Sequence, residues 1–114
     1  MATATRKPPV YTVYVIELKA DVLSLKRFAE ANPGYTYDPT HPPLYVGHSV
    51  RTPEERFEQH RIGKKASRYT RGNAICLRRD LAGSLIFPTR REAELMEERH
   101  AMILRERGYA VWQN

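Results

Sequence analysis

The most unusual side chain in the second half of the chain is a glutamate set among apolar neighbours. Residues 89–107 have helical spacing, and at about 100° per residue Glu97 falls on the apolar face of that helix. Leu95 and Met102 lie on the opposite face, so the apolar stripe is imperfect. A carboxylate in such a stripe either binds a cation or lies at the stripe's edge and reaches water, and the pattern leaves both open. The shared face contains Ala93, Met96, Glu97, His100, Ile103 and Leu104.

Two basic side chains one helical turn apart could act on a phosphate. Arg56 and His60 are four residues apart in a segment with helical spacing, so they lie one above the other on one face. A planar guanidinium can hold a phosphate through two hydrogen bonds, and an imidazole can transfer a proton. The plain alternative is an exposed polar helix face, and the pair alone does not decide between the two.

A basic segment follows that helix directly. It mixes cations with hydroxyl and aromatic side chains, which are suited to phosphate oxygens and to base stacking. A solvated loop is the alternative, but four cations within eight residues favour contact with nucleic acid. The cations are Lys64, Lys65, Arg68 and Arg71, and the residues between them include Ser67, Tyr69 and Thr70.

Two tyrosines lie on predicted strands. A tyrosine in a strand usually fills the core or covers the surface, and this is the plain interpretation of Tyr14 and Tyr45. Gly47, two residues after Tyr45, adds a second signal, because a glycine in a strand lets a ligand or a backbone approach closely.

The elements that must position these side chains are predicted to be of mixed type, so we expect an α+β domain with a small antiparallel three-stranded sheet flanked by helices. The strand at 10–18 is apolar on both faces, which predicts a central strand. Capping boxes at Thr52 and Thr89 predict two helix starts. The predicted strands are 10–18, 44–47 and 74–79, with a further extended segment at 109–112, and the predicted helices are 21–31, 53–62 and 90–107.

Composition fits a single domain, and its basic charge is consistent either with an anionic partner or with a merely basic soluble protein. The 114 residues suffice for one domain, at 10–114, after a flexible lead-in at 1–9. Nineteen basic against 13 acidic residues give a formal charge of +6, which suits nucleic acid. The single cysteine, Cys76, excludes an internal disulfide. No apolar run approaches the ~20 residues of a membrane span, so we expect a cytoplasmic protein with no membrane partner.

Read in order, these features resemble the GIY-YIG nuclease superfamily over roughly residues 10–110. Each tripeptide is weak alone, whereas the shared order is specific. The first glycine of the name motif is Thr12 here, and 19–43 is an insertion between the two tyrosine motifs. His48 directly after the second motif is unusual, and the family's late asparagine has no clear counterpart unless Asn114 serves. The matching features are Thr12-Val13-Tyr14, Tyr45-Val46-Gly47, Arg56 with His60, the segment 63–71, and Phe87-Pro88-Thr89 followed by Glu92 and Glu97.

The resemblance implies an endonuclease that hydrolyses phosphodiester bonds in DNA with one divalent ion, Mg²⁺ or Mn²⁺. It implies that Glu97 holds the ion, that Arg56 clamps the phosphate, and that a tyrosine, by analogy Tyr14, accepts a proton from the attacking water. His60 and one of Lys64 or Lys65 would assist, and Tyr45 would orient the water or the phosphate. An ordinary phenol is a poor base at neutral pH, so nearby cations would have to lower its pKa.

Two other functions are consistent with the same residues. A non-catalytic nucleic-acid-binding module would keep the basic segment and the charge, but it would not need Glu97 together with both tyrosines. A protein-interaction domain would use the proline- and tyrosine-rich insertion at 19–43 for docking. The sequence leaves open whether the DNA is duplex, branched or single-stranded.

Overall fold

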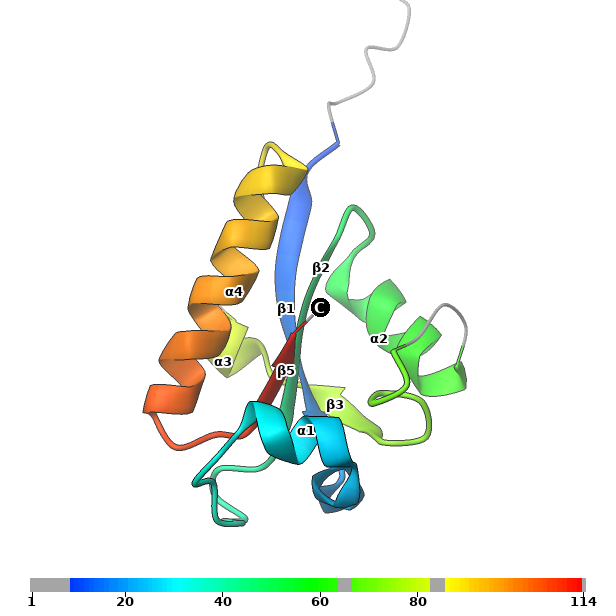
Figure 1. The fold of residues 1–114 in the computed structure, drawn as a ribbon. Coiled ribbons are helices and arrows are strands. Elements are labelled where there is room, and N and C mark those ends of the chain that lie inside the picture. The colour runs from blue at the N-terminus through cyan, green and yellow to red at the C-terminus, as the bar shows by residue number, and fades with distance from the viewer. Residues whose placement is uncertain (1–8, 64–66, 83–85, 114) are drawn as a thin grey trace, which may run out of the picture.

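The fold, seen in a computed structural model that describes residues 9–63, 67–82 and 86–113, alternates strands and helices along the chain (Figure 1). It is an α+β domain, as the mixed pattern predicted. The elements are β1 (Tyr11–Leu18), the 3₁₀ helix η1 (Ala20–Ser24), α1 (Lys26–Ala31), β2 (Leu44–Ser49), α2 (Pro53–Ile62), β3 (Ala74–Leu77), α3 (Arg79–Ala82), β4 (Ile86–Phe87), α4 (Arg90–Glu106) and β5 (Val111–Gln113).

The sheet within the described residues has five strands, so the prediction of three strands was wrong. β1 is central, as its two apolar faces predicted, and it pairs antiparallel with β2, β3 and β4. β5 lies beside β2 and runs parallel to it, so the sheet is mixed rather than antiparallel. β5 overlaps the extended segment predicted at 109–112. β4 was not predicted, because two residues are too few to show the alternation by which a strand is recognised in a sequence.

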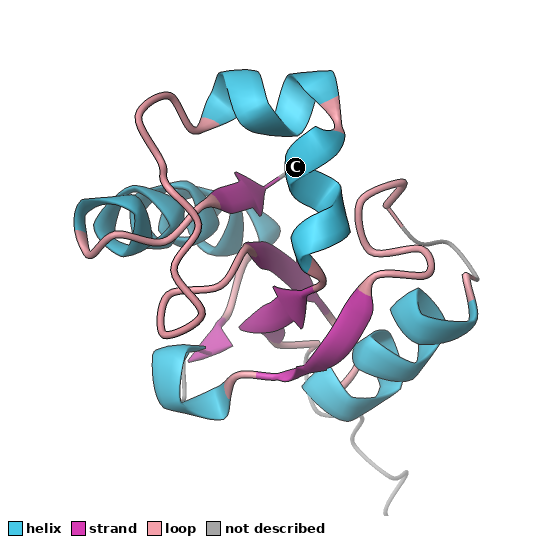
Figure 2. Cartoon of the chain, turned by 90° about the horizontal axis from the view of Figure 1, so that it is seen from below, coloured by secondary structure: helices cyan, strands magenta, loops and turns pink. Residues whose placement is uncertain are grey.

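Helices cover both faces of the sheet (Figures 1 and 2). Val13 and Val15 of β1 face α3 and α4, where they join one apolar cluster with Ala101 and Leu104. The alternate side chains Tyr14, Ile16 and Leu18 face the other side and pack with η1, α1 and the segment around Tyr69. The period-two alternation of β1 thus divides the core into two layers.

Two capped helices begin where the sequence predicted. The Thr52 hydroxyl accepts a hydrogen bond from the Glu55 amide at 3.2 Å, and the Thr89 hydroxyl accepts one from the Glu92 amide at the same distance. Gly63 ends α2 in the left-handed region, at φ 83°. These helices carry the Arg56–His60 pair and Glu97, so their start points decide which way those side chains face.

The predicted helix at 21–31 is two short helices rather than one. Leu25 is extended, with ψ 124°, and separates η1 from α1. The Ser24 hydroxyl donates to the Asp21 carbonyl at 2.8 Å, which is the local contact by which serine competes with regular helix bonding.

A buried asparagine joins the 19–43 segment to the C-terminal strand. The Asn32 amide nitrogen donates to the carbonyls of Phe28 and Val111 at 2.9 and 3.0 Å. Its oxygen accepts from the Val111 amide at 2.7 Å and from Arg105 Nε at 3.0 Å. This part of the chain is therefore packed into the sheet edge and is not a loose appendage.

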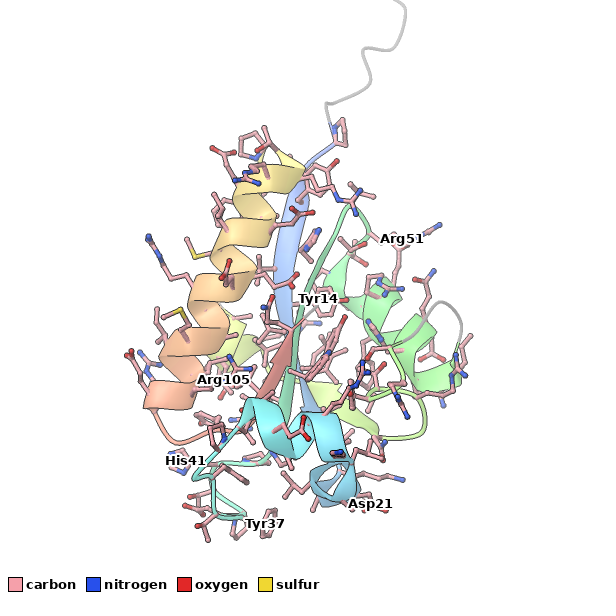
Figure 3. All side chains as sticks on the ribbon, in the orientation of Figure 1. Tyr14, Asp21, Tyr37, His41, Arg51 and Arg105 are labelled. Carbon is pink, nitrogen blue, oxygen red and sulfur yellow. The ribbon has the colours of Figure 1, made fainter. Side chains whose placement is uncertain are left out.

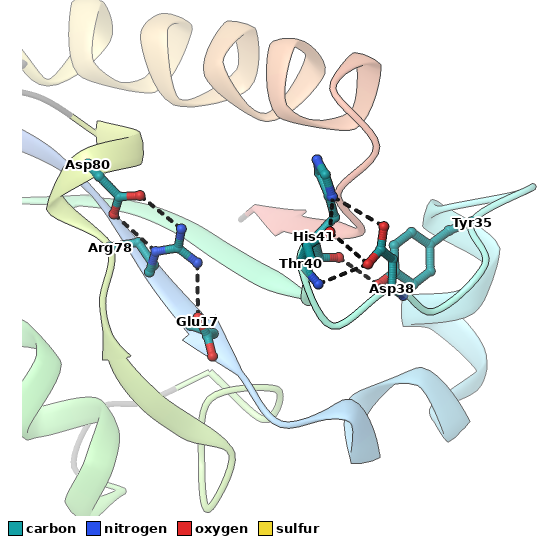
Figure 4. A network of polar contacts seen from close by, with 7 residues as sticks. All are labelled: Glu17, Tyr35, Asp38, Thr40, His41, Arg78 and Asp80. Atoms are coloured by element: carbon teal, nitrogen blue, oxygen red, sulfur yellow. Dashed lines mark hydrogen bonds and ion pairs between the residues drawn. The ribbon is translucent and has the colours of Figure 1, made fainter.

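Polar contacts also shape the outer loops (Figure 4). The strand predicted at 74–79 ends at Leu77, because α3 begins at Arg79. Between the two elements, the Arg78 side chain binds Glu17 at 2.9 Å and Asp80 at 2.8 Å. In the 19–43 segment, the Tyr35 hydroxyl donates to the His41 carbonyl at 2.7 Å and closes that loop.

Within the described ranges, no helix combines the length and the apolar character that crossing a membrane requires.

Candidate active site

The first predicted tyrosine lies directly over the glycine of the second tripeptide. Tyr14 pairs with Gly47 across β1 and β2, and both phenol rings are buried, with Tyr14 and Tyr45 each 2% exposed. A Cβ on Gly47 would meet the Tyr14 hydroxyl at 2.6 Å and the Tyr45 ring at 2.9 Å. Glycine is needed here because the two rings occupy the space that any side chain would take.

His60 joins the strand and helix residues into one hydrogen-bonded group. Its Nε2 lies 2.9 Å from the Tyr14 hydroxyl and 3.0 Å from Arg56 Nη2, and its Nδ1 lies 2.7 Å from Thr70 Oγ1. A guanidinium only donates, so Nε2 is the acceptor and the proton of the neutral ring is on Nδ1. Nδ1–H then donates to Thr70, whose hydroxyl donates onward to the Ser67 carbonyl at 3.0 Å.

Burial keeps this imidazole neutral. His60 is fully buried, and burial, followed by the nearby charge of Arg56, lowers its pKa to about 4. At neutral pH its Nε2 is therefore free of a proton and can accept the one that Tyr14 carries. Figure 3 shows Tyr14 between β1 and α2, where this contact is made.

The two phenols are harder to ionise than free tyrosine, contrary to the expectation that nearby cations lower their pKa. Burial raises the pKa of Tyr14, and the charge and hydrogen bonding of Arg56 offset only part of that rise. Burial also raises the pKa of Tyr45, with a further increase from Tyr14 and Glu97. A phenolate is thus not the resting form of either side chain.

Glu97 is buried on α4 and binds a histidine that the family pattern does not include. The carboxylate is 2% exposed, which excludes the stripe-edge interpretation. His48 Nδ1 donates to Glu97 Oε2 at 2.5 Å, and His48 is only partly buried. His100, predicted beside Glu97, instead lies with its Nε2 2.6 Å from the carbonyl of Leu81.

Glu97 approaches the tyrosines from the other side of the sheet. The register places His48 on the face of β2 that α4 covers, whereas Tyr45 faces α2. β5 pairs with β2 only over Leu44 to Val46, so among the described strands none continues that pairing at Gly47 and His48. At this open edge of β2, the negative charge of Glu97 raises the pKa of Tyr14 and Tyr45, whereas the positive charge of Arg56 lowers it.

A hollow of about 410 Å³ opens above the buried groups. His48, which binds Glu97, and Arg56, which binds His60, both line it. Arg51, in the β2–α2 connection (Figure 3), adds a second cation to the lining. Arg90, at the start of α4, adds a third. Three guanidinium groups in one hollow suit an oxygen-rich anion such as a phosphate. The other lining residues are Tyr11, Ser49, Val50 and Gln59.

The basic segment after α2 divides into an exposed part and a buried part. Arg68 and Arg71 are exposed and available to an anion. Tyr69 is 3% exposed and packs on Phe28 and Trp112, so its predicted role as a stacking ring for nucleic acid is corrected to a core role. Lys64 and Lys65 lie outside the described residues.

The donors present fit a magnesium-type ion rather than a closed metal cage. Among the described residues, no group of three or more His, Cys, Asp or Glu side chains could hold a metal ion. Mg²⁺ commonly binds through one or two carboxylates and completes its shell with water and substrate phosphate. Glu97 offers one buried carboxylate, and His48, which binds it, is among the residues that line the arginine-rich hollow. The carboxylate would hold the ion while His48 fixes its orientation.

Sequence reasoning did not assign two residues of this group. Thr70 was placed among hydroxyls that contact phosphate, but it is fully buried and holds His60 Nδ1. His48 was noted only as unusual, because its contact with Glu97 depends on how β2 and α4 pack against each other, which the sequence does not show. Comparison of the chain with protein-family models, curated proteins and solved structures gives no match.

Proposed function

We propose that this protein is a divalent-metal-dependent endonuclease that hydrolyses phosphodiester bonds in DNA. One observation carries the proposal: Tyr14, Arg56 and His60 form a hydrogen-bonded group, and Arg56 lines an arginine-rich hollow. The negative charge of the buried Glu97 carboxylate raises the pKa of Tyr14 and Tyr45, so it lies within electrostatic reach of that group. Structural stability alone does not explain this arrangement, because burying several ionisable groups together is costly.

Arg56 is the residue best suited to bind the scissile phosphate. Its guanidinium lines the hollow while one nitrogen is held by Gln59 Oε1 at 2.5 Å and another by His60 Nε2 at 3.0 Å. These bonds fix the plane of the group before a substrate arrives. A preorganised cation stabilises the negative charge that builds on phosphate oxygens in the transition state.

Tyr14 and His60 together provide a path for the proton of an attacking water. The water's proton would pass to the Tyr14 oxygen while the Tyr14 proton passes to His60 Nε2, 2.9 Å away. A concerted transfer avoids a free phenolate, which burial disfavours. Growing negative charge on the phosphate would offset the cost of protonating His60 next to Arg56.

Glu97 would hold one Mg²⁺ or Mn²⁺, which supplies charge neutralisation at the phosphate and at the leaving oxygen. His48 is a positioning residue in this proposal. Its Nδ1–H fixes Oε2 of Glu97, so the other carboxylate oxygen is aimed in one direction. Burial of the carboxylate strengthens its attraction for a cation, because few waters compete for it.

Cleavage assays with matched variants test the proposal. Plasmid, branched and single-stranded DNA, and an RNA of the same sequence, would be incubated with the protein in Mg²⁺, in Mn²⁺ and in EDTA. Arg56→Ala should slow cleavage by a factor on the order of 10² to 10³, the usual cost of one electrostatic element. Arg61→Ala, an exposed arginine of the same helix that pairs with Glu58, is the control and should cut like the parent.

The same assay separates catalysis from binding alone. If the parent binds DNA in EDTA but cuts none of these nucleic acids in either metal, the protein is a non-catalytic nucleic-acid-binding module. If RNA is cut and DNA is not, the substrate assignment changes while the roles of Arg56 and Glu97 stand. Equal rates for the parent and Arg56→Ala would overturn the phosphate-binding role.

A further inference from the structure

A pocket of about 480 Å³ lies between the loop that follows α1 and the last turn of α4 (Figure 1). Residues 31–36 form one wall, and Arg105, Gly108 and Tyr109 form the other. A volume of this size is typical of sites for small molecules. Arg90, which lines the arginine-rich hollow, is at the other end of the same 17-residue helix, so the two sites are roughly 20 Å apart along its axis.

Arg105 brings a positive charge to this pocket that no carboxylate in the described part of the chain balances. Its Nε donates to Asn32 Oδ1 at 3.0 Å and its Nη2 donates to the Val111 carbonyl at 2.7 Å, and both acceptors are neutral. Burial lowers the pKa of Arg105, because the charge has lost part of its hydration. A partly buried cation without a counter-ion gains from an anionic ligand.

The same two hydrogen bonds determine which edge of the guanidinium is left for a ligand. They hold the edge formed by Nε and Nη2 against Asn32 and β5, and Figure 3 shows Arg105 beside that strand. The edge formed by Nη1 and Nη2 can donate two parallel hydrogen bonds, which match the two oxygens of a carboxylate. The last carbonyls of α4 already accept from the amides of residues 107–109, so they add little negative charge to this wall.

Two half-buried tyrosines give the pocket flat walls of fixed orientation. The Tyr35 hydroxyl donates to the His41 carbonyl at 2.7 Å (Figure 4), and the His41 ring lies 4.7 Å from the ring of Tyr109. Each tyrosine ring also packs against the apolar core. Beside them, a Cβ on Gly34 would meet nothing within 4 Å, so the space there is open. Fixed aromatic walls around open space suit a flat ring.

We propose that this pocket binds a small molecule that carries one carboxylate on a flat ring. The carboxylate would accept two hydrogen bonds from Arg105, and the ring would lie against Tyr35 and Tyr109. Arg105 is the one charged side chain among the described residues that line the pocket, so it matches a single negative charge. A phosphate monoester carries close to two charges and favours several cations, as the arginine-lined hollow offers.

This site is separate from the proposed active site. It shares no lining residue with the arginine-lined hollow, and none of its residues contacts Tyr14, His60 or Glu97 among the bonds described above. The inference therefore goes beyond the proposed function, and loss of cleavage would not bear on it.

A nuclear magnetic resonance titration of the full, isotope-labelled chain with benzoate tests the proposal. Benzoate should shift the amide signals of Gly34 and Gly108 until they saturate, with a dissociation constant on the order of millimolar, because one ion pair and one ring supply the affinity. Benzamide has the same shape without the charge and should bind about tenfold more weakly. Phenyl phosphate shares the ring, and tighter binding than that of benzoate would overturn the carboxylate assignment.

Two positions locate the charge that the probe meets. Arg105→Gln should weaken benzoate binding about tenfold, and circular dichroism would check its fold, because Arg105 also holds Asn32 and Val111. Thr36 is exposed and lines the same pocket, so substitutions there leave those bonds intact. Thr36→Glu should weaken benzoate binding about threefold and Thr36→Lys should strengthen it by a similar factor.

The opposite signs at residue 36 separate an electrostatic effect from a steric one, since a larger side chain alone would act in the same direction in both variants. A parent that shows no saturable shift with benzoate would overturn the proposal. Benzoate binding that a folded Arg105→Gln protein keeps unchanged would do so too, as would changes of the same sign in Thr36→Glu and Thr36→Lys.

Discussion

At the residue scale, the hydrogen bonds of His60 fix both its tautomer and its charge. Arg56 can only donate, so the imidazole must accept at Nε2, and Thr70 accepts from Nδ1–H. A second proton would have to sit on Nε2, facing a guanidinium inside the protein. This is why burial and Arg56 lower the His60 pKa to about 4.

That pKa predicts a specific loss of stability in mild acid. An unfolded histidine has a pKa of about 6.5, so between pH 6.5 and 4 the unfolded chain binds a proton that folded His60 does not. The free energy of unfolding contributed by His60 is therefore fully present above pH 6.5 and falls as the pH drops toward 4, by up to about 3 kcal/mol. Urea unfolding at a series of pH values measures it.

His60→Gln is the matched variant for this measurement. Glutamine keeps a polar side chain but does not titrate, so its unfolding free energy should vary less between pH 6.5 and 4 than that of the parent. Exposed carboxylates contribute equally to both curves and cancel in the difference. Parallel curves would mean that His60 has the same pKa in the folded and the unfolded protein, so that its pKa is not lowered by folding.

A methyl group at Gly47 should disturb the two phenols directly. Gly47→Ala places a carbon 2.6 Å from the Tyr14 hydroxyl, and buried rings cannot move far. We expect a loss of about 1–3 kcal/mol in the free energy of unfolding, the usual cost of overpacking. Tyr14→Phe removes the hydroxyl oxygen but keeps the Tyr14 ring carbon at 2.7 Å, so Gly47→Ala should still destabilise the Tyr14→Phe protein. A Gly47→Ala protein as stable as the parent would contradict the contact.

Sequence reasoning identified the residue types at this scale better than their surroundings. Tyr14, Arg56 and His60 were named from motif order and helical spacing, and they are in contact. Burial was harder to predict, as Tyr69 shows, because a basic segment rich in hydroxyls gives no sign that one ring turns into the core. The Glu97–His48 contact joins residues 49 positions apart and follows only from strand and helix placement.

At the scale of elements, the insertion and the C-terminal strand depend on one amide. Asn32 uses both its donor and its acceptor groups between α1, Arg105 and β5.

Local signals predicted the helix caps at Thr52 and Thr89, because capping involves residues three positions apart. The parallel pairing of β2 with β5 joins residues that are far apart in the sequence, so local sequence patterns do not predict it.

Asn32→Asp tests the contact that the Asn32 amide makes between α1 and β5. The substitution keeps the shape but replaces the amide donor with an oxygen that would face the carbonyls of Phe28 and Val111. We expect a loss of about 2–4 kcal/mol in the free energy of unfolding, because both amide hydrogen bonds are lost and a carboxylate oxygen is held against two carbonyl oxygens, although the Val111 carbonyl keeps Arg105 Nη2 as a donor. The urea midpoint at neutral pH measures it, with Asp21→Asn at an exposed position as the control. A change below about 0.5 kcal/mol, typical of a surface site, would contradict the claim that the Asn32 amide stabilises this contact.

At the scale of the whole molecule, the chain has a net charge of +6, and the proposed substrate would bind at a hollow lined by arginines. Arg51, Arg56 and Arg90 line one hollow. Binding of DNA in EDTA should weaken as salt rises, because phosphate contacts release counterions. Arg51→Ala and Arg90→Ala should each lower the slope of log affinity against log salt by about 1. Slopes equal to the parent's would place the DNA elsewhere.

The most direct test of the central claim is the rate of a single cleavage event with and without the Glu97 carboxylate. Protein would be in excess over DNA in Mn²⁺, so that binding does not limit the rate, and affinity would be measured separately in EDTA. Glu97→Gln should bind DNA like the parent and cut it slower by a factor on the order of 10² to 10³. The neighbouring exposed Glu98→Gln should match the parent. A Glu97→Gln protein that cuts as fast as the parent would contradict the account.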